Sequence, residues 1–395
     1  MRFGIDRAAM EPASWGCGGR VGLVTNHAAR LGADPGRPGR VALLEAGVRI
    51  VRLFAPEHGL WAAAADGEAV PDGHDPVTGL PVTSLYGNRL QPGAAELEGL
   101  EAVLFDVQDA GIRFYTYLWS LFHLMQVAAR LDRRVVVLDR PNLLGGDLSL
   151  AEGPILDVDS CGSFLGRTDM PVRHSLTIGE LARLWQAERF PRLALDVVPL
   201  DGWEGRPDGR TAGLALVPPS PALTSWTAIF LYGGLCLFEA TNLSVGRGSE
   251  FAFQTIGAPW LRAGRLLRWI EECPDLRRVK AETVDFVPGE GVWAGELCHG
   301  VRFSPAAGAG HRPVSFGLRL LSHLAAEHQE HFAWRPYPTA ANPGGERHLE
   351  LLLGRAELAR LLRVSPAAVD SAAIRQWTAV PNWATRARPF LLYDG

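Results

Sequence analysis

Apolar and polar residues alternate along the first half of the chain in a pattern that predicts strands separated by helices. Unbroken runs of valine, leucine and isoleucine are typical of parallel strands buried on both faces. The predicted strands cover residues 20–26, 49–54, 80–86, 101–108, 134–139 and 193–200. Helical periodicity covers residues 41–47, 118–131 and 177–188, the last opened by a capping box. This order predicts an α/β fold, with a Rossmann-like parallel sheet.

The second half of the chain predicts a smaller domain of α+β type. A proline-rich stretch at residues 218–221 separates a Rossmann-like N-terminal catalytic domain, 1–228, from a C-terminal domain, 229–395, that closes the cleft. Helical periodicity covers residues 227–239, 261–273, 314–331 and 349–362, and weak strand patterns cover 284–287 and 300–303. Residues 62–79 are rich in glycine, proline and aspartate, and a loop of this length is usually functional or disordered.

Polar side chains follow four of the predicted strands. They are Asn26 with His27, Glu57 with His58, Asp106 with Gln108 and Asp109, and Asp139 with Arg140 and Asn142. The carboxyl ends of parallel strands meet at one edge of a sheet, where ligands bind in open α/β folds. The pattern therefore predicts a binding site at this edge.

Composition and charge exclude several classes of protein. There are 39 Lys and Arg residues against 43 Asp and Glu, a balance that argues against a nucleic-acid partner. No apolar stretch reaches the length of a membrane span. The opening MRFGIDRAAMEP lacks the apolar region of a secretory signal, which predicts a cytoplasmic protein, with the mature part of an exported protein as the alternative. The pattern does not indicate an oligomeric state.

Motifs for metals and cofactors are missing from the sequence. The five cysteines are scattered and form no C-x-x-C, so we expect neither a disulfide framework nor a zinc ribbon. The chain has no phosphate-binding loop motif and no dinucleotide motif after its first strand. We therefore predict no metal and no cofactor.

Aromatic and basic residues near the strand ends add candidates for ligand binding. Tyr115 and Tyr117 follow a strand end, where stacking on a sugar and plain packing are equally good readings. Arg113, Arg140 and Arg247 could each be a surface charge, but arginines beside strand-end carboxylates more often pair with them or with an anionic ligand.

Several segments taken together resemble one known family. They are VGLVTNHAAR, LFAPEHGL, TGLPVTSLYG, LFDVQDAGIRFYTY, VVLDRPNLLGGD, EGPILD, MPVRHSLTIGELARLW, VPPSPAL and LFEATNLSVGRGSEFAFQTIGAPW. They resemble the exo-β-N-acetylmuramidase family of peptidoglycan hydrolases over about residues 20–260, and more weakly to the end. The resemblance implies a glycosidase that releases N-acetylmuramic acid from the non-reducing end of peptidoglycan fragments, with Glu57 as the catalytic glutamate. Gln254 departs from the family pattern, because relatives often carry a glutamate there.

Glycoside hydrolysis needs one carboxylic acid to protonate the leaving oxygen and a second group at the anomeric carbon. We expect Glu57 to be the acid, with a pKa raised by its apolar surroundings, and His58 to orient it or to contact the sugar. Asp106, Asp109 and Glu239 are the candidates for the second carboxylate, and the pattern does not choose among them. The acetamido group of the substrate could itself assist.

Muramic acid carries a lactyl carboxylate, which Arg113, Arg140 or Arg247 could bind with two parallel hydrogen bonds. The other predicted contacts to the saccharide are Asn26, Gln108, Asp139, Asn142, Asn242, Ser244 and Gly248. Two alternatives stay open: a hydrolase or transferase acting on another anionic sugar, and a sugar-binding protein without catalysis.

Overall fold

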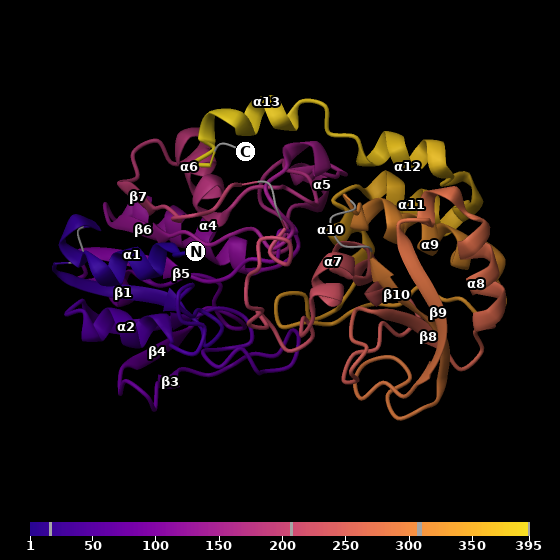
Figure 1. The fold of residues 1–395 in the computed structure, drawn as a ribbon, viewed down its shortest axis with the longest axis horizontal. Coiled ribbons are helices and arrows are strands. Elements are labelled where there is room, and N and C mark those ends of the chain that lie inside the picture. Colours follow the sequence, from indigo (N-terminus) through magenta and orange to yellow (C-terminus); the bar gives the residue numbers. More distant parts are fainter. Residues whose placement is uncertain (16–17, 206–207, 306–309, 394–395) are drawn as a thin grey trace.

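The N-terminal part of the chain is built on a seven-stranded sheet (Figure 1). The computed structural model describes residues 1–15, 18–205, 208–305 and 310–393. In sheet order, the strands are β3 (Gly73–His74), β4 (Pro81–Ser84), β2 (Arg49–Ala55), β1 (Arg20–Thr25), β5 (Ala102–Asp106), β6 (Arg134–Leu138) and β7 (Leu195–Val198). Neighbouring strands are parallel except β3 and β4. This arrangement confirms the predicted Rossmann-like sheet.

Helices cover both faces of this sheet, because successive side chains of a strand point to opposite sides. On one face, Leu23 and Leu104 lie in the same buried cluster as residues of α1 (Gly4–Met10) and α2 (Gly39–Glu45). On the other face, Val103 and Phe105 share a cluster with residues of α4 (Tyr117–Arg130) and α6 (Ile178–Arg189). Two one-turn helices, α3 (Ala94–Leu97) and α5 (Val158–Cys161), lie in the connections.

The C-terminal part contains a smaller antiparallel sheet of three strands, β8 (Thr255–Ala258), β10 (Cys298–Pro305) and β9 (Val279–Phe286), in that order. Its helices are α7 (Trp226–Leu235), α8 (Ala263–Glu272), α9 (Pro313–Glu327), α10 (His348–Leu353), α11 (Ala356–Val364) and α12 (Ser371–Thr378). Helices α7 and α9 approach so closely that a side chain at Gly234 would lie 2.1 Å from the carbonyl oxygen of Pro313.

Two predicted helices differ from the observed ones. The helix expected over residues 349–362 is broken into α10 and α11, because Gly354 has a left-handed backbone with φ +73°. The helix expected over residues 227–239 ends at Leu235 and continues as a 3-10 turn, Cys236–Ala240. This turn carries Glu239 toward the N-terminal domain. Strand β8 was not predicted, since its four residues lie in a glycine-rich stretch.

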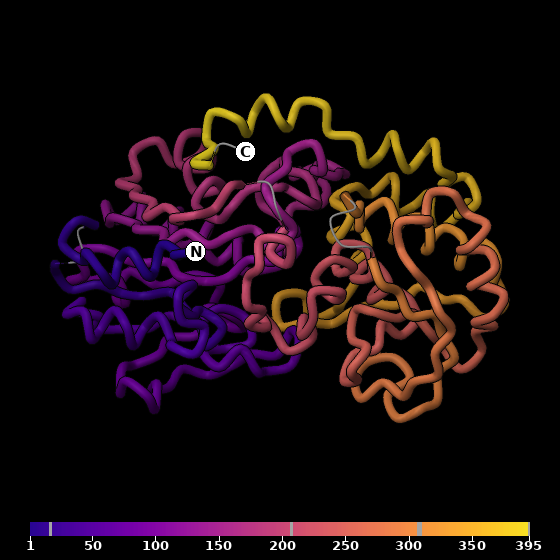
Figure 2. The backbone as a smooth tube through the Cα atoms, in the orientation of Figure 1, coloured from indigo at the N-terminus to yellow at the C-terminus, as the bar shows by residue number. Residues whose placement is uncertain are grey.

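The C-terminal segment returns to the N-terminal domain, as the yellow trace shows (Figure 2). It contains α13 (Trp383–Ala387), whose Trp383 indole donates a hydrogen bond to the carbonyl of His174, 2.8 Å away. One buried apolar cluster contains residues of both sheets, including Phe105 and Phe303. The two domains therefore share a core.

Among the described residues, no helix combines the length and the apolar character that crossing a membrane requires. Cys161, Cys236, Cys273 and Cys298 are free and buried, and Cys17 lies outside the described residues.

Candidate active site

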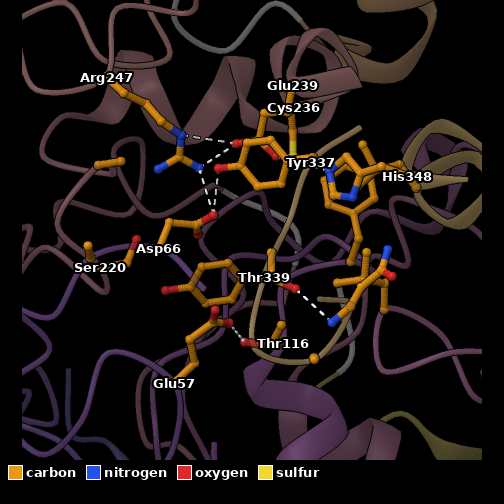
Figure 3. A pocket seen from close by; sticks show the side chains of 18 of the residues that line it. Glu57, Asp66, Thr116, Ser220, Cys236, Glu239, Arg247, Tyr337, Thr339 and His348 are labelled. Atoms are coloured by element: carbon orange, nitrogen blue, oxygen red, sulfur yellow. Dashed lines mark hydrogen bonds and ion pairs between the residues drawn. The ribbon is translucent and has the colours of Figure 1, made fainter. Parts of the chain in front are cut away.

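A cavity of about 690 Å³ lies between the two domains and is lined by residues of both (Figure 3). The N-terminal domain contributes the segments that follow β2, β4 and β5. The C-terminal domain contributes the end of α7, the segment 247–253 and the segment 337–348. Of the residues predicted to act in catalysis or binding, the structure brings Glu57, His58, Tyr115, Glu239, Arg247 and Gly248 to the cavity wall.

Glu57 follows strand β2, which ends at Ala55 just before Pro56. The side chain of Glu57 lines the cavity. Its side chain is 6% exposed. The Thr116 hydroxyl donates a hydrogen bond of 2.6 Å to one carboxylate oxygen, and the backbone N–H of Gly67 donates one of 3.1 Å to the other. Burial and the negative charge of Asp66 raise the pKa of Glu57, although the electrostatic effect of His58 and hydrogen bonds from Thr116 and Tyr86 oppose the change. This is the environment of a carboxyl group that keeps its proton to donate it.

His58 has a left-handed backbone, with φ +65°, which is uncommon for a residue with a side chain. Its Nδ1 lies 2.8 Å from the carbonyl oxygen of Ala64. A carbonyl can only accept, so Nδ1 is the donor in this hydrogen bond. Strained backbone of this kind clusters at active sites, where the surrounding contacts hold it in place.

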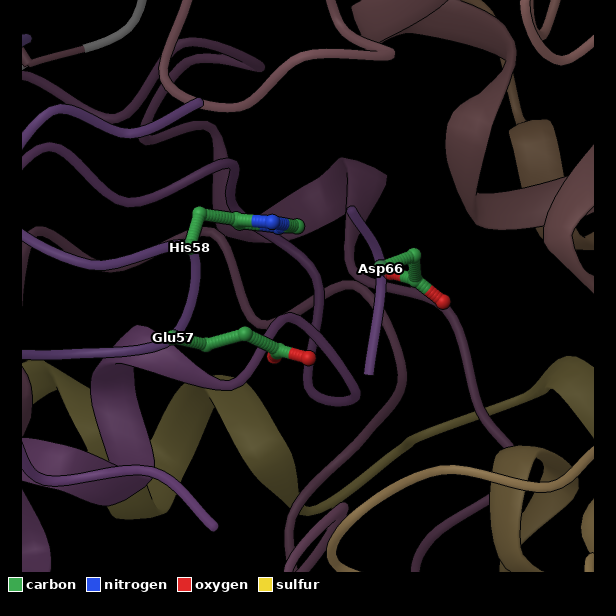
Figure 4. Close-up of side chains that lie close together, drawn as sticks. All are labelled: Glu57, His58 and Asp66. Carbon is green, nitrogen blue, oxygen red and sulfur yellow. The ribbon is translucent and has the colours of Figure 1, made fainter. Parts of the chain in front are cut away.

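Asp66 is the functional candidate that the sequence pattern missed. Glu57, His58 and Asp66 each offer a ligand atom within 4.8 Å of the other two (Figure 4). Asp66 accepts a hydrogen bond of 2.7 Å from the Tyr337 hydroxyl and lies 3.5 Å from a nitrogen of Arg247. The available signal is the long loop over residues 62–79, which begins three positions after Gly59 of the PEHG segment.

These three side chains could also hold a metal ion. A cation there would expel the proton that a general acid must carry, since metal ligands bind in their deprotonated form. The donor set therefore fits a metal geometrically, but it serves acid catalysis only without one.

Glu239 reaches the cavity from the 3-10 turn after α7, and both of its carboxylate oxygens have partners. Arg247 donates to it through Nε, at 3.1 Å, and through Nη2, while Nε2 of His348 lies 3.4 Å from it. Burial raises the pKa of Glu239, but the charges of Arg247 and His348 outweigh burial and hold the pKa at about 2. Glu239 is thus a permanent anion that fixes Arg247.

The other residues predicted at the strand ends do not line this cavity. Asp106 forms a buried ion pair of 2.7 Å with Arg140. The Gln108 amide donates to the carbonyls of Asp109 and Pro141. Gln108 and Arg140 line a separate cavity of about 290 Å³. Asn26 is buried and accepts a hydrogen bond from the backbone of Ala28.

A second group of predicted contacts is used to fix loops. Arg113 is buried and donates to the carbonyls of Pro154, Met170 and Leu352. Asp109 accepts from the backbone of Gly111, and Asn142 donates to the carbonyl of Leu176. Asp139 accepts from Thr177, Gly179 and Tyr393. Loops at strand ends need hydrogen-bond partners for their backbone, and these polar side chains supply them.

Tyr117, Asn242 and Ser244 do not line the cavity either. The Tyr117 hydroxyl donates to the carbonyl of Pro219, 3.0 Å away, and its ring packs against that of Tyr115. Asn242 bonds the backbone of residues 331 and 333, and Ser244 accepts from the N–H of Gly246. Gln254 is 5% exposed and does not line the cavity.

Fold and site together define a class of protein. A buried carboxyl with a raised pKa, close to a second carboxylate in a cavity between two domains, is the arrangement of a glycosidase. The shape of the fold alone would not show this, since Rossmann-like domains serve many functions.

Comparisons with known proteins give the particular family. The family models for exo-β-N-acetylmuramidase NamZ match residues 21–227 (N-terminal part) and 230–393 (C-terminal part). The chain is similar to peptidoglycan β-N-acetylmuramidase NamZ of Bacillus subtilis, with 34% identity over 84% of this chain and 79% of that protein. The chain belongs to the exo-β-N-acetylmuramidase NamZ family.

Two solved structures of DUF1343-family proteins from Bacteroides fragilis have the same architecture. One has a TM-score of 0.84 at 25% identity, and the other a TM-score of 0.73 at 26% identity. In both comparisons, 99% of this chain and 98% of the other are covered.

Proposed function

We propose that this protein is a glycoside hydrolase that releases terminal N-acetylmuramic acid from the non-reducing end of peptidoglycan fragments, in cell-wall turnover or recycling. Membership of the NamZ family supports the substrate class. The observation that carries the chemistry is the Glu57 carboxyl, buried in the cavity with a raised pKa.

In the first step, Glu57 donates its proton to the glycosidic oxygen as the bond to the anomeric carbon breaks. The leaving sugar departs as an alcohol, and positive charge develops on the muramic acid ring. Glu57, now ionised, then takes a proton from the water that attacks the anomeric carbon. This return restores the acid and balances the reaction.

Asp66 is the second carboxylate in this proposal, in place of the three that the sequence suggested. Its nearest oxygen lies within 4.8 Å of that of Glu57. Retaining glycosidases hold their two carboxyl groups about 5–5.5 Å apart, whereas inverting enzymes leave room for a water molecule between them. Glu239 is a poorer candidate, because Arg247 and His348 already occupy its oxygens.

Asp66 can act in two ways that share one outcome. It can attack the anomeric carbon itself, or it can orient the substrate acetamido group so that the acetamido oxygen attacks. In either route the attacking water then displaces this oxygen from the anomeric carbon, which restores Asp66 or the acetamido group. The carbon is therefore inverted twice, and the released sugar keeps its β configuration.

The test is incubation of the protein with a disaccharide that carries N-acetylmuramic acid at its non-reducing end. We expect free N-acetylmuramic acid, first as the β anomer in proton NMR spectra recorded within minutes. Glu57→Gln should lower kcat/KM by about 10²–10⁴-fold, the usual contribution of a general acid. Normal turnover by Glu57→Gln, or release of the α anomer, would contradict the assignment.

A further inference from the structure

The cavity contains a guanidinium group that none of the predicted contacts included. We propose that Arg347 binds the lactyl carboxylate of the muramic acid and so selects it over glucosamine, an inference that rests on the proposed function. Arg347 lies at the start of α10 and lines the same cavity as Glu57.

The hydrogen-bonding groups of Arg347 are largely unused. Its Nη2 donates to the carbonyl of Ser160, 2.6 Å away on α5 of the other domain. Among the described residues, no carboxylate lies within ion-pair distance of Arg347, and Nε and Nη1 have no partner. A guanidinium has five donors in a rigid plane, so a group held by one of them can still bind a carboxylate with two others.

The nearby acidic side chains are directed elsewhere. Glu350 is bound by both terminal nitrogens of Arg363. The carboxylate of Glu346 folds against Gly344, where its oxygens would contact any added side chain. Although burial opposes the change, the pKa of Glu350 is lowered by its contacts with Arg363 and, to a smaller extent, by the charge of Arg347, but neither acid forms an ion pair with Arg347.

The other cationic groups considered for this role are already occupied. Arg247 faces two carboxylates, those of Glu239 and Asp66. Arg113 and Arg140 are buried outside the cavity. Binding of a third carboxylate to Arg247 would add negative charge beside two existing ones, whereas Arg347 has no carboxylate at ion-pair distance among the described residues.

The backbone holds Arg347 in an unusual conformation. Its φ and ψ are 58° and 20°, in the left-handed region that residues with side chains seldom adopt. The two residues before it are held by hydrogen bonds, since the N–H of Tyr337 donates to the carbonyl of Gly345 at 2.9 Å and the side-chain amide of Asn342 donates to the carbonyl of Glu346 at 3.1 Å. Strain of this kind persists where the surroundings over-determine it, and it is common at ligand-binding positions.

The experiment compares two aryl glycosides that differ only in the lactyl ether, a β-N-acetylmuramide and a β-N-acetylglucosaminide. Arg347→Asn is the main variant, because asparagine tolerates a left-handed backbone better than other residues with side chains. We expect kcat/KM for the muramide to fall about 10- to 100-fold, mainly through KM, as for the loss of a charged hydrogen-bonded contact. The value for the glucosaminide should not change.

Two further variants sharpen the comparison. Arg347→Lys keeps the charge but not the two parallel donors, so its muramide value should fall between those of the wild type and Arg347→Asn. Arg360→Asn alters an exposed arginine on α11 that does not line the cavity, and it should behave as the wild type. An unchanged preference in Arg347→Asn, or an equal loss on both substrates, would overturn the proposal.

Binding measurements separate this inference from the proposed function. If the wild type cleaves neither glycoside, the proposed activity fails. Calorimetric titration with free N-acetylmuramic acid and N-acetylglucosamine still tests whether Arg347 binds the lactyl carboxylate. If Arg347→Asn binds N-acetylmuramic acid more weakly than the wild type but binds N-acetylglucosamine equally well, the role of Arg347 is supported. Equal binding of both sugars by wild type and variant would refute it.

Discussion

The pKa of the Glu57 carboxyl is set by its neighbours, and Asp66 and Thr116 shift this pKa in opposite directions. Burial and the charge of Asp66 raise its pKa, and the Thr116 hydroxyl lowers it by bonding to the ionised form. As a general acid, Glu57 must be protonated, so kcat/KM should fall as the pH rises through its pKa. The pH at which activity falls, the basic limb of the profile, therefore reports the pKa of Glu57, and its change in a variant reports the effect of the altered neighbour on that pKa.

Removal of the Thr116 hydroxyl should move the basic limb to higher pH. In Thr116→Val the ionised carboxylate loses a donor, so the protonated acid persists to a higher pH. The measurement is kcat/KM for an aryl muramide between pH 4 and pH 9. Thr116→Ser retains the hydroxyl and serves as the control. A limb that stays in place, or that moves to lower pH, would show that another group titrates.

Removal of the Asp66 charge should act in the opposite direction. In Asp66→Asn the pKa of Glu57 falls, because an adjacent negative charge is gone, and the basic limb moves to lower pH. Turnover should also fall by about 10²-fold or more if Asp66 is the second carboxylate. The same pH series measures both effects. Unchanged turnover would remove Asp66 from the mechanism while leaving Glu57 in place.

Sequence patterns identified Glu57 but not most of its surroundings. The strand-end rule located the right edge of the sheet, and four polar clusters follow the strands there. Only the Glu57–His58 cluster faces the cavity, because a pattern shows where a side chain starts but not which backbone groups it must satisfy. Arg113 is the clearest example, since all three of its hydrogen bonds go to carbonyls that are distant in sequence.

At the scale of elements, the contact between α7 and α9 fixes the C-terminal wall of the cavity. The two helices meet at Gly234 and Gly317, where a side chain on Gly317 would lie 2.4 Å from the Cα of Gly234. The atoms that would clash belong to the backbone, so no side chain can move aside. Helix α7 leads directly into the turn that carries Glu239.

Gly234→Ala should therefore destabilise the protein by about 1–3 kcal/mol, the usual cost of overpacking. Urea unfolding monitored by circular dichroism would measure the loss. Gly264→Ala on α8 is the matched control, because nothing lies within 4 Å of the added methyl group. It should be neutral or stabilising by less than about 1 kcal/mol. Equal stabilities of the two variants would disprove the close approach.

Elements were predicted well where periodicity was long, and less well where the backbone departs from it. The parallel strands and helix α6 with its Thr177 cap follow the pattern. The break between α10 and α11 at Gly354 was not predicted, since a single glycine in a leucine-rich helical stretch is compatible with a continuous helix. The antiparallel sheet was only partly predicted, because β8 has only four residues and lies in a glycine-rich stretch.

At the scale of the whole molecule, the C-terminal segment joins the two domains into one unit. Arg386 forms ion pairs with Asp169 and Glu188, and the Tyr393 hydroxyl donates 2.6 Å to Asp139. Domains normally move relative to one another unless their interface is large and apolar. Here a shared apolar cluster and this segment argue for a single cooperative body.

Scanning calorimetry should accordingly show one unfolding transition for the whole chain. Two separate domains with independent cores would unfold in two steps. Two resolved transitions would show that the shared core contributes little to the link between the domains.

The bond from Tyr393 to Asp139 should make stability depend on pH. Burial raises the pKa of Asp139 to about 6, although Tyr393 and Thr177 lower it by bonding to the ionised form. Because the folded protein favours protonated Asp139, this group stabilises the fold fully below the ordinary aspartate pKa. The contribution is lost as the pH rises through about 6. In Tyr393→Phe the pKa rises further, so the loss continues to higher pH. The variant should be destabilised more at pH 8 than at pH 5, by about 1.5–3 kcal/mol at the upper end.

Tyr117→Phe is the control for this comparison. Its hydroxyl donates to the carbonyl of Pro219, which does not titrate, so its penalty in urea unfolding should be the same at both pH values. A pH-independent penalty for Tyr393→Phe as well would mean that Asp139 does not ionise in this range.

The returning C-terminal segment has a consequence for biosynthesis. Tyr393 follows Asp139 by 254 residues, yet its hydroxyl donates a hydrogen bond to Asp139, directly after strand β6 of the first domain. Nascent chains usually fold domain by domain from the N-terminus. In this protein the first domain receives these contacts only after the second domain has been synthesised, so a chain cut short before α13 would leave Asp139, Asp169 and Glu188 without these partners and open to cellular proteases.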